Sequence, residues 1–298
     1  RFIKSQGQAR ATKYLSAISN PLLRQFDIDR YFSEDSDNRK NTRKTFDFQI
    51  FKNLQDLFLK KELDLFNHIG KSFQKETIKL APDILKRELE RFVIEFSWKS
   101  SKIEGNTYSL LETESLIKEQ KTAIGKTKDE ALMILNHKSA FDLILQNKND
   151  FKNISVSKIN QLHNLLVKDL NITTGLRKQA VGITGSTYRP LDNVHQIKEV
   201  FEKMIIIIND NKNVFEKALI AHFMISYIQP YGDGNKRTSR MLTNAILLAH
   251  DLFPLSYRSV NEDNFKKALI LFYEQGSIFE IKRLFIEQIK FANETYFR

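Results

Sequence analysis

From residue 227 to residue 240 the chain reads Tyr-Ile-Gln-Pro-Tyr-Gly-Asp-Gly-Asn-Lys-Arg-Thr-Ser-Arg. Pro230 cannot continue a preceding helix, while Gly232 and Gly234 allow backbone conformations that other residues resist. Apolar residues recur at helical spacing before this stretch, from 214 to 228, and after it, from 237 to 250. The stretch therefore predicts one helix, a tight loop and a second helix.

The loop predicts an anion site. Its amide groups precede the amino end of the second helix, where the helix dipole is positive. Arg237 and Arg240 are three residues apart and share a face of that helix, so together they can bind more than one phosphate group. Asp233 can hold a hard cation such as Mg²⁺ that bridges phosphates. Glycine and asparagine also dominate ordinary turns, so a plain turn beside surface arginines remains the alternative interpretation.

The same stretch resembles the signature of the Fic family, His-Pro-Phe-x-Asp/Glu-Gly-Asn-Gly/Lys-Arg-x-x-Arg. The matching residues are Pro230, Tyr231, Asp233, Gly234, Asn235, Lys236, Arg237 and Arg240. Members of that family transfer a nucleoside monophosphate, usually AMP from ATP, onto a protein hydroxyl. The resemblance implies ATP and Mg²⁺ as cofactors and a Ser, Thr or Tyr hydroxyl of a partner protein as the acceptor.

The resemblance also assigns roles within the loop. Asp233 would bind Mg²⁺ and Arg240 would meet the γ-phosphate. The phosphate-binding set would be Gly232, Gly234, Asn235, Lys236, Arg237 and Arg240. Gln229 stands where the family has its catalytic histidine, and a neutral amide has no nitrogen basic enough to take a proton near pH 7. We therefore expect an adenylyltransferase that is inactive in this form, with a non-enzymatic nucleotide sensor and a DNA-binding regulator as alternatives.

A second motif lies towards the N-terminus. Residues 100–106 read Ser-Ser-Lys-Ile-Glu-Gly-Asn and resemble the family's inhibitory motif, Ser/Thr-x-x-x-Glu-Gly/Asn. The motif residues would be Ser100, Glu104, Gly105 and Asn106. The resemblance implies that Glu104 pairs with Arg240, which would compete with the γ-phosphate for that guanidinium group. An ordinary exposed carboxylate is the alternative interpretation of Glu104.

Residues 177–190 combine two glycines with β-branched residues and predict a short β-hairpin between helices. Part of it, residues 181–188, resembles the flap with which Fic proteins hold a target segment by strand addition. The target-binding residues would be Gly182, Ile183, Thr184, Gly185 and Ser186. A hairpin that only closes the surface is the alternative.

The remainder of the 298 residues predicts an all-α protein, a Fic-type helical bundle with this small β-hairpin flap and a short N-terminal β-hairpin. Further helices are expected around 48–58, 85–96, 110–120, 128–146, 155–168, 194–209, 262–273 and 278–297. We expect residues 1–45 to form an N-terminal hairpin and linker, and residues 46–298 to form the helical domain, with a core from about 91 to 255. His222 is interpreted as a packed structural histidine.

The composition of the chain limits the kinds of site, location and partner that we expect. The chain contains no cysteine, which excludes disulfides and thiolate zinc sites and favours a cytoplasmic location. The longest apolar runs are far short of the roughly 20 residues that cross a bilayer, so no membrane is expected. A formal net charge of +11 favours anionic partners, among them DNA. Residues 7–14 resemble the wing of a winged-helix domain, so DNA binding through a missing N-terminal part and a homodimer remain open.

Overall fold

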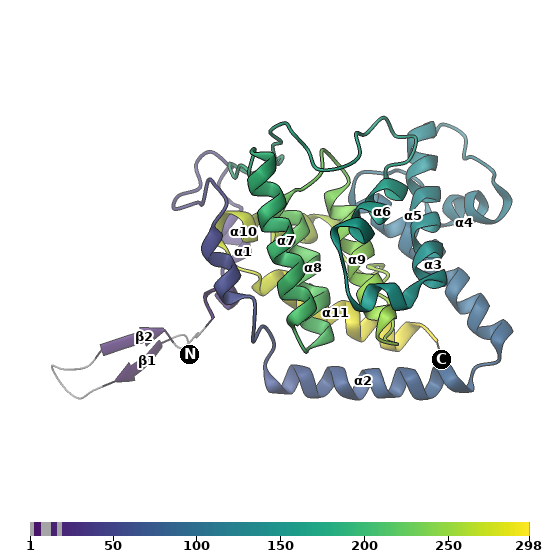
Figure 1. Ribbon diagram of the computed structural model, residues 1–298, viewed down its shortest axis with the longest axis horizontal. Helices are drawn as coiled ribbons and strands as arrows, with labels where there is room; N and C mark the ends of the chain where they lie inside the picture. The colour runs from purple at the N-terminus through teal and green to yellow at the C-terminus, as the bar shows by residue number, and fades with distance from the viewer. Residues whose placement is uncertain (1–2, 7–12, 17–19, 298) are drawn as a thin grey trace.

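The structure, a computed structural model, describes residues 3–6, 13–16 and 20–297, and side chains from residue 20 onwards (Figure 1). Strands β1 (Ile3–Gln6) and β2 (Lys13–Ser16) pair antiparallel, with Ile3 opposite Ser16. This confirms the two strands of the predicted N-terminal hairpin. The turn between them, and with it most of the segment that resembles a wing, lies outside the described residues.

Helices make up most of the rest, as the all-α prediction requires. The first part of the chain forms α1 (Ile28–Tyr31), the 3-10 helix η3 (Phe48–Asn53), α2 (Lys60–Lys79), α3 (Pro82–Ile103), α4 (Leu110–Glu119), α5 (Lys128–Gln146) and α6 (Val156–Leu166). The second part forms α7 (Val194–Asp210), α8 (Val214–Ile228), α9 (Asn235–Ala249), α10 (Glu262–Gln275) and α11 (Phe279–Thr295). Two further 3-10 turns are η2 (Pro21–Leu23) and η4 (Lys148–Lys152).

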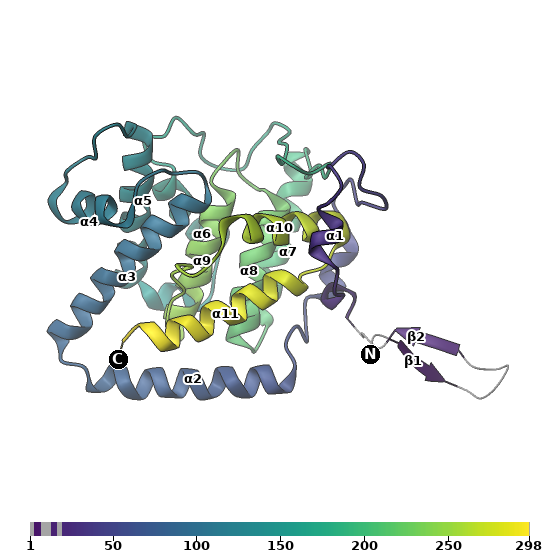
Figure 2. The ribbon, with the colours of Figure 1, turned by 180° about the vertical axis from the view of Figure 1, so that it is seen from behind.

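Helix α8 is the centre of the bundle. Every residue from Phe215 to Ile228 is buried, which is the pattern of a helix surrounded by protein on all sides. Helices α7 and α9 lie beside it, α11 crosses behind it, and α2 runs along one edge (Figures 1 and 2). Because α8 has no solvent face, the chain at its C-terminus is fixed by packing on every side.

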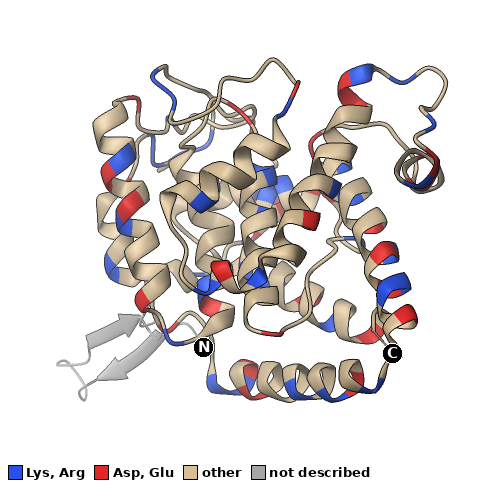
Figure 3. Ribbon diagram, turned by 45° about the vertical axis from the view of Figure 1, so that its right-hand side comes forward, with Lys and Arg blue, Asp and Glu red and all other residues tan. Residues whose placement is uncertain are grey.

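Charged residues are confined mostly to the outer faces. Lysine and acidic residues are both spread along α2 (Figure 3). The apolar residues Phe66 and Ile69 of the same helix are buried against the body. Among the described residues, no helix is long and apolar enough to cross a membrane.

Two features differ from the sequence-based expectation. The helix expected around residues 48–58 is wrong beyond η3, because Asp56 takes a left-handed φ of 54° that interrupts any helix. Leu54, Leu57 and Phe58 are nevertheless buried in the core, although the chain there is not helical. Helix α2 lies where no helix is predicted, although Leu63, Phe66, Ile69 and Phe73 recur at helical spacing and pack on the core.

The predicted hairpin at residues 177–190 does not form two paired strands. Within the described chain, the segment makes a turn in which the Ser186 amide donates to the Ile183 carbonyl at 3.1 Å. In the described chain, its only β-type pairing is an isolated parallel bridge between Arg189 and Thr45. The edge that a hairpin partner would occupy is instead shared with a segment distant in the sequence.

Asn244 in α9 offers a test of how the core is closed. Its side chain accepts from the Leu255 amide at 2.7 Å and donates to the Leu255 carbonyl at 3.0 Å, with Asn244 fully buried. Asn244→Ala leaves both backbone groups without partners, so we expect a loss of about 3 kcal/mol in the free energy of unfolding, measured by urea denaturation. Asn147→Ala, which removes one exposed bond to the Leu143 carbonyl, is the control. Equal losses for the two variants would contradict this assignment.

Candidate active site

The loop between α8 and α9 is built by two left-handed residues. Gln229 ends α8 with φ 50°, and Gly234 precedes α9 with φ 78°. A Cβ atom on Gly234 would lie 2.9 Å from Val167, so glycine is required there by both conformation and space. Helix α9 has no side-chain cap and no acidic residue in its first turn. Its first amides therefore keep their hydrogen-bonding capacity at the positive end of the helix dipole.

Asn235 holds the loop in shape from inside. Its Oδ1 accepts from the Tyr231 amide at 2.9 Å, and its Nδ2 donates to the Tyr231 carbonyl at 2.8 Å. The Tyr231 ring stacks on His163 at 3.7 Å between centroids, and its hydroxyl donates to Asn160 at 2.7 Å. His163 donates in turn to the Asp233 carbonyl at 3.0 Å. Burial lowers the pKa of His163. The loop is therefore a rigid unit anchored on α6.

Gln229 turns its side chain into this unit. Its Nε2 donates to the Ser226 carbonyl at 2.7 Å, and its Oε1 accepts from Asn235 Nδ2 at 2.9 Å. Both ends of the amide are thus engaged within the protein. His222 does not replace the missing histidine: it is buried, stacks on Tyr257, and burial lowers its pKa to about 3. The interpretation of His222 as a packed structural residue is confirmed.

Arg177 is a loop-supporting residue that sequence reasoning missed. Its Nε donates to the Gln229 carbonyl at 2.6 Å, and its amide donates to the Pro230 carbonyl at 3.0 Å. Its guanidinium also binds the carbonyls of Gln179 and Leu191. All of these acceptors are backbone atoms, which leave no signature in the sequence. Arg177 joins the start of the flap segment to the loop.

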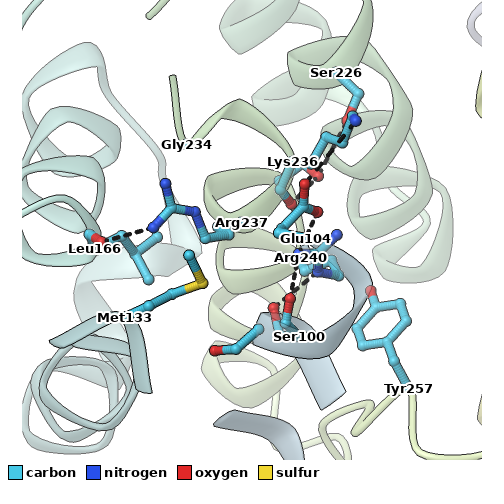
Figure 4. Close-up of polar contacts among 12 residues, drawn as sticks. Ser100, Glu104, Met133, Leu166, Ser226, Gly234, Lys236, Arg237, Arg240 and Tyr257 are labelled. Atoms are coloured by element: carbon cyan, nitrogen blue, oxygen red, sulfur yellow. Dashed lines mark hydrogen bonds and ion pairs between the residues drawn. The ribbon is translucent and has the colours of Figure 1, made fainter. Parts of the chain in front are cut away.

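The two arginines of α9 point to different sides (Figure 4). Arg237 is buried and donates to the Leu166 carbonyl at 3.3 Å, with Asp233 at 3.4 Å from its other nitrogen. Burial lowers the pKa of Arg237, although Asp233 and Glu104 act in the opposite direction. Arg240 lies one turn along and reaches the C-terminus of α3 instead. The pair therefore flanks the start of the helix rather than forming one side-by-side clamp.

Arg240 is paired with Glu104, as the resemblance implies. Arg240 Nη2 lies 2.8 Å from Glu104 Oε1, and the same guanidinium donates to the hydroxyl and the carbonyl of Ser100, each at 2.9 Å. Lys236 Nζ is 4.0 Å from the other carboxylate oxygen. Arg240 is fully buried, while Glu104 keeps 20% of its side chain exposed. Burial alone would raise the pKa of Glu104, but Arg240 and Lys236 outweigh it and hold that pKa below its ordinary value.

The end of α3 places this carboxylate. Glu104 is the C-terminal cap, and Gly105 turns the chain with φ 99°. Asn106 then accepts from the Tyr108 amide at 3.0 Å and donates to the Glu130 carbonyl at 2.8 Å. Two of the motif residues, Ser100 and Glu104, thus bind Arg240. The other two, Gly105 and Asn106, fix the turn that follows.

His137 supports Ser100 from below and was not found from the sequence. Its Nε2 lies 2.9 Å from the Ser100 hydroxyl, and its Nδ1 lies 2.7 Å from the Met133 carbonyl. Since a carbonyl can only accept, Nδ1 carries the proton and Nε2 accepts from Ser100. Burial lowers the pKa of His137 to about 3, so the ring stays neutral. The serine oxygen is thereby left to accept from Arg240.

The flap segment lies against the same loop. A Cβ atom on Gly232 would meet the Gln179 side chain at 3.5 Å. Tyr188 donates to the Tyr227 carbonyl at 3.1 Å, two residues before Gln229. In the described chain, the amides from 181 to 185 make no hydrogen bond. One edge of this segment is therefore open beside the loop.

Asp233 is the carboxylate of the loop, with 68% of its side chain exposed. One oxygen accepts from the Gly234 amide at 2.6 Å and the other faces Arg237. Among the described residues, no group of three or more His, Cys, Asp or Glu side chains could hold a metal ion by itself. A single carboxylate fits Mg²⁺, which proteins bind with one or two carboxylates together with substrate phosphates.

The sequence model of the Fic/DOC family matches residues 153–247, which include the flap segment and the whole loop. Residues 153–247 therefore form a Fic domain. The match to the Fic family model leaves out residues 100–106, which the fold nevertheless brings to Arg240.

Curated relatives of this Fic protein agree with the match. The protein adenylyltransferase Fic of Aedes aegypti is 31% identical over 174 residues, which cover 55% of this chain and 34% of that protein. The protein of the same name from Nematostella vectensis is 27% identical over 188 residues, covering 58% of this chain and 42% of that protein. The chain thus spans less than half the length of these relatives.

Solved Fic structures show the same fold. Fic-1 of C. elegans, residues 134–508, superposes with a TM-score of 0.68 at 19% identity, over 79% of this chain and 72% of that one. A Fic domain containing signaling protein from Bacteroides thetaiotaomicron gives 0.63 at 21% identity, over 78% and 96%. The fold of the Fic domain therefore extends well beyond the residues that the family model matches.

Glu104 is expected to contribute an acid-sensitive part of the stability. Because its pKa is lowered in the folded Fic protein, the contribution is present above the ordinary value of 4.5 and is lost as pH falls through the lower folded value. We expect Glu104→Gln to cost roughly 2 kcal/mol near neutral pH, and less and less below about pH 4.5, measured by urea denaturation. Exposed Glu119, as Glu119→Gln, is the control. A difference independent of pH would contradict the assignment.

Proposed function

We propose that this chain binds ATP at the loop between α8 and α9 and descends from enzymes that transfer AMP to a protein hydroxyl. The observation that carries the proposal is the uncapped start of α9, preceded by Gly234 in the left-handed conformation and flanked by Arg237 and Arg240. Open amides at a positive helix end form a site for phosphate groups. The adenylyltransferase names of the curated relatives support the reaction class.

In the proposed complex the α- and β-phosphates lie on the amides of the loop and of Asn235 and Lys236, and the γ-phosphate reaches Arg240. Arg237 adds positive charge at the same helix end. Asp233 is exposed and able to hold Mg²⁺ together with phosphate oxygens. Bound there, the ion would neutralise charge on the phosphates.

The acceptor in this proposal is a Ser, Thr or Tyr hydroxyl of a partner protein. Its segment adds as a strand to residues 181–185, whose amides have no hydrogen-bond partners in the described chain. Since Tyr188 fixes the end of that segment to the α8 terminus, a strand on this edge lies next to the phosphate loop. The Gly182, Ile183 and Thr184 backbone would then set the register of the target.

Glu104 holds the site in check in this proposal. Its carboxylate occupies Arg240 at 2.8 Å and lies near Lys236, both of which belong to the proposed phosphate set. A γ-phosphate must displace it, because the same donors cannot serve both anions fully. ATP is then expected to bind weakly or without its γ-phosphate in place.

Gln229 limits the chemistry. In AMP transfer the acceptor oxygen bonds to the α-phosphorus, the bond to pyrophosphate breaks, and the acceptor proton must pass to a base. The Gln229 amide has no basic nitrogen, and both its ends are bonded to Ser226 and Asn235. Loss of a general base costs about 10²–10⁴-fold in rate, so this form is expected to bind nucleotide with little or no transfer.

Nucleotide binding is the first test. We expect Glu104→Gly to tighten the Kd for ATP with Mg²⁺ by about tenfold, because Arg240 becomes free, with binding measured by titration calorimetry. Arg237→Ala is expected to abolish the signal, while the surface variant Arg283→Ala leaves it unchanged. Circular dichroism checks that Arg237→Ala remains folded. Equal affinity in a folded Arg237→Ala protein would refute the phosphate site.

Transfer is the second test. The double variant Gln229→His with Glu104→Gly is expected to label proteins in a cell lysate, or itself, from α-labelled ATP. The matched control, Gln229→Asn with Glu104→Gly, has the same free Arg240 but no base, and we expect its labelling to be at least a hundredfold weaker. If the histidine variant binds ATP and Mg²⁺ yet transfers no label, the proposed transfer chemistry is wrong.

A nucleotide sensor is the second candidate, favoured by one observation. The Gln229 side chain donates to Ser226 and accepts from Asn235. It therefore stabilises the loop of the binding site without any catalytic role. A sensor binds ATP or ADP with measurable affinity and shows no transfer in any variant at position 229. The two tests above therefore separate the candidates.

A further inference from the structure

Glu274 of α10 is a fully buried carboxylate outside the phosphate site. Four groups donate to it. Tyr31 and Arg39 donate to Oε2 at 2.6 and 2.7 Å, and the Ser186 hydroxyl and the Thr187 amide donate to Oε1 at 2.7 and 3.4 Å. The two oxygens thus divide between two segments far apart in the sequence. One side binds the N-terminal segment and the other binds the flap.

Arg39 joins the same two segments directly. Its Nη1 pairs with Glu274, and its Nη2 donates to the Gly185 carbonyl at 2.6 Å. Only 6% of the Arg39 side chain is exposed. A planar guanidinium can make both bonds at once, which a lysine cannot do with the same geometry. The linker expected within residues 1–45 therefore carries one partner of a buried ion pair.

Further contacts extend this junction over the N-terminal segment, residues 31–45. The Arg43 amide donates to the Glu274 carbonyl at 2.7 Å, and the Arg189 amide donates to the Lys44 carbonyl at 2.9 Å. Thr45 and Arg189 form the single parallel bridge of this region. The chain's own N-terminal segment thus contacts the chain at Gly185 and Arg189, which leaves residues 181–184 for a target.

The packing around Gly185 and Tyr188 explains why these contacts hold the turn of the flap in place. Gly185 sits at the turn with φ 80°, and a Cβ there would touch Ile270 of α10 at 3.5 Å. Below it, Tyr188 stacks on Tyr227 and Tyr273 at 5.0 and 5.5 Å between ring centroids. The stretch from 181 to 184, between Arg177 and this anchor, has free amides. Its position is therefore set at its two ends, by Arg177 before it and by Arg39 and Glu274, which hold residues 185–187.

We propose that Glu274 and Arg39 are positioning residues of the target-binding flap, through which the N-terminal segment fixes the edge that receives the target. This rests on the proposed role of the flap in binding a target segment. Release of Arg39 loosens the flap while the phosphate loop stays intact, since neither residue binds the loop from 229 to 234. Docking of the N-terminal segment then controls acceptor binding separately from nucleotide binding.

Hydrogen exchange by mass spectrometry tests the proposal on the intact chain. In Arg39→Ala, the amides of residues 186–189, each of which donates a hydrogen bond in the folded protein, are expected to exchange at least tenfold faster than in the unsubstituted protein, while peptides of α8 and α9 are unchanged. Glu274→Gln is expected to act in the same direction, and Arg39→Lys to restore protection in part because it keeps the charge. The control, Arg30→Ala, removes an exposed arginine of α1, directly before this segment.

Faster exchange confined to the flap distinguishes a positioning role from a general loss of stability. Faster exchange spread over α8 and α9 in Arg39→Ala and Glu274→Gln alike would mean a merely structural role, and unchanged exchange at 186–189 would mean no coupling. Either result overturns the proposal. The exchange measurement needs no nucleotide, so it stands even if ATP fails to bind and the proposed function falls.

The transfer assay then measures how loosening the flap affects labelling of acceptor proteins. In the Gln229→His, Glu104→Gly protein, adding Arg39→Ala is expected to lower labelling of lysate proteins about tenfold, with the KM for ATP unchanged. Adding Arg30→Ala is expected to change neither. Equal labelling with and without Arg39, in a protein that labels, would also overturn the proposal.

Discussion

The structure depends on the complete burial of α8 against α9. Because α8 has no face towards solvent, its C-terminus cannot shift without disturbing the whole core, and the six residues that follow must reverse direction in a confined space. Gln229 and Gly234 achieve this with two left-handed conformations, and Asn235 bridges the loop between them. The open amides at the start of α9 result from this constraint, since a loop closed from within supplies no side-chain cap.

Charge around that helix end is balanced by distant parts of the chain. Arg240 is fully buried and would be costly to leave unpaired, yet it finds Glu104 and Ser100 at the end of α3. The inner support comes from His137, which stays neutral at all ordinary pH because it is buried. A phosphate placed at this helix end competes with an internal carboxylate, so the same contact stabilises the fold and lowers the affinity for an anion.

A similar principle operates at the opposite side of the flap. Glu274 is a buried charge whose oxygens are fully supplied with donors from two segments. Such a pair favours one arrangement over others more than it adds stability. The flap has few backbone bonds of its own, so its conformation is determined by side chains of α10 and of residues 31–45. This explains why residues 177–190 do not form the hairpin that their glycines and β-branched residues favour.

The sequence by itself determined the local features: the helices with strong apolar periodicity, the break at Pro230, the left-handed Gly234 and the motif that ends at Arg240. Each of these follows from the conformational limits of a few neighbouring residues. It also indicated the pairing of Glu104 with Arg240, but only through resemblance, since 136 positions separate the two. Tertiary structure alone decided the roles of Arg177, His137, Arg39 and Glu274. Their partners are backbone atoms or residues distant along the chain, and no local pattern encodes contacts that exist only once the helices have packed.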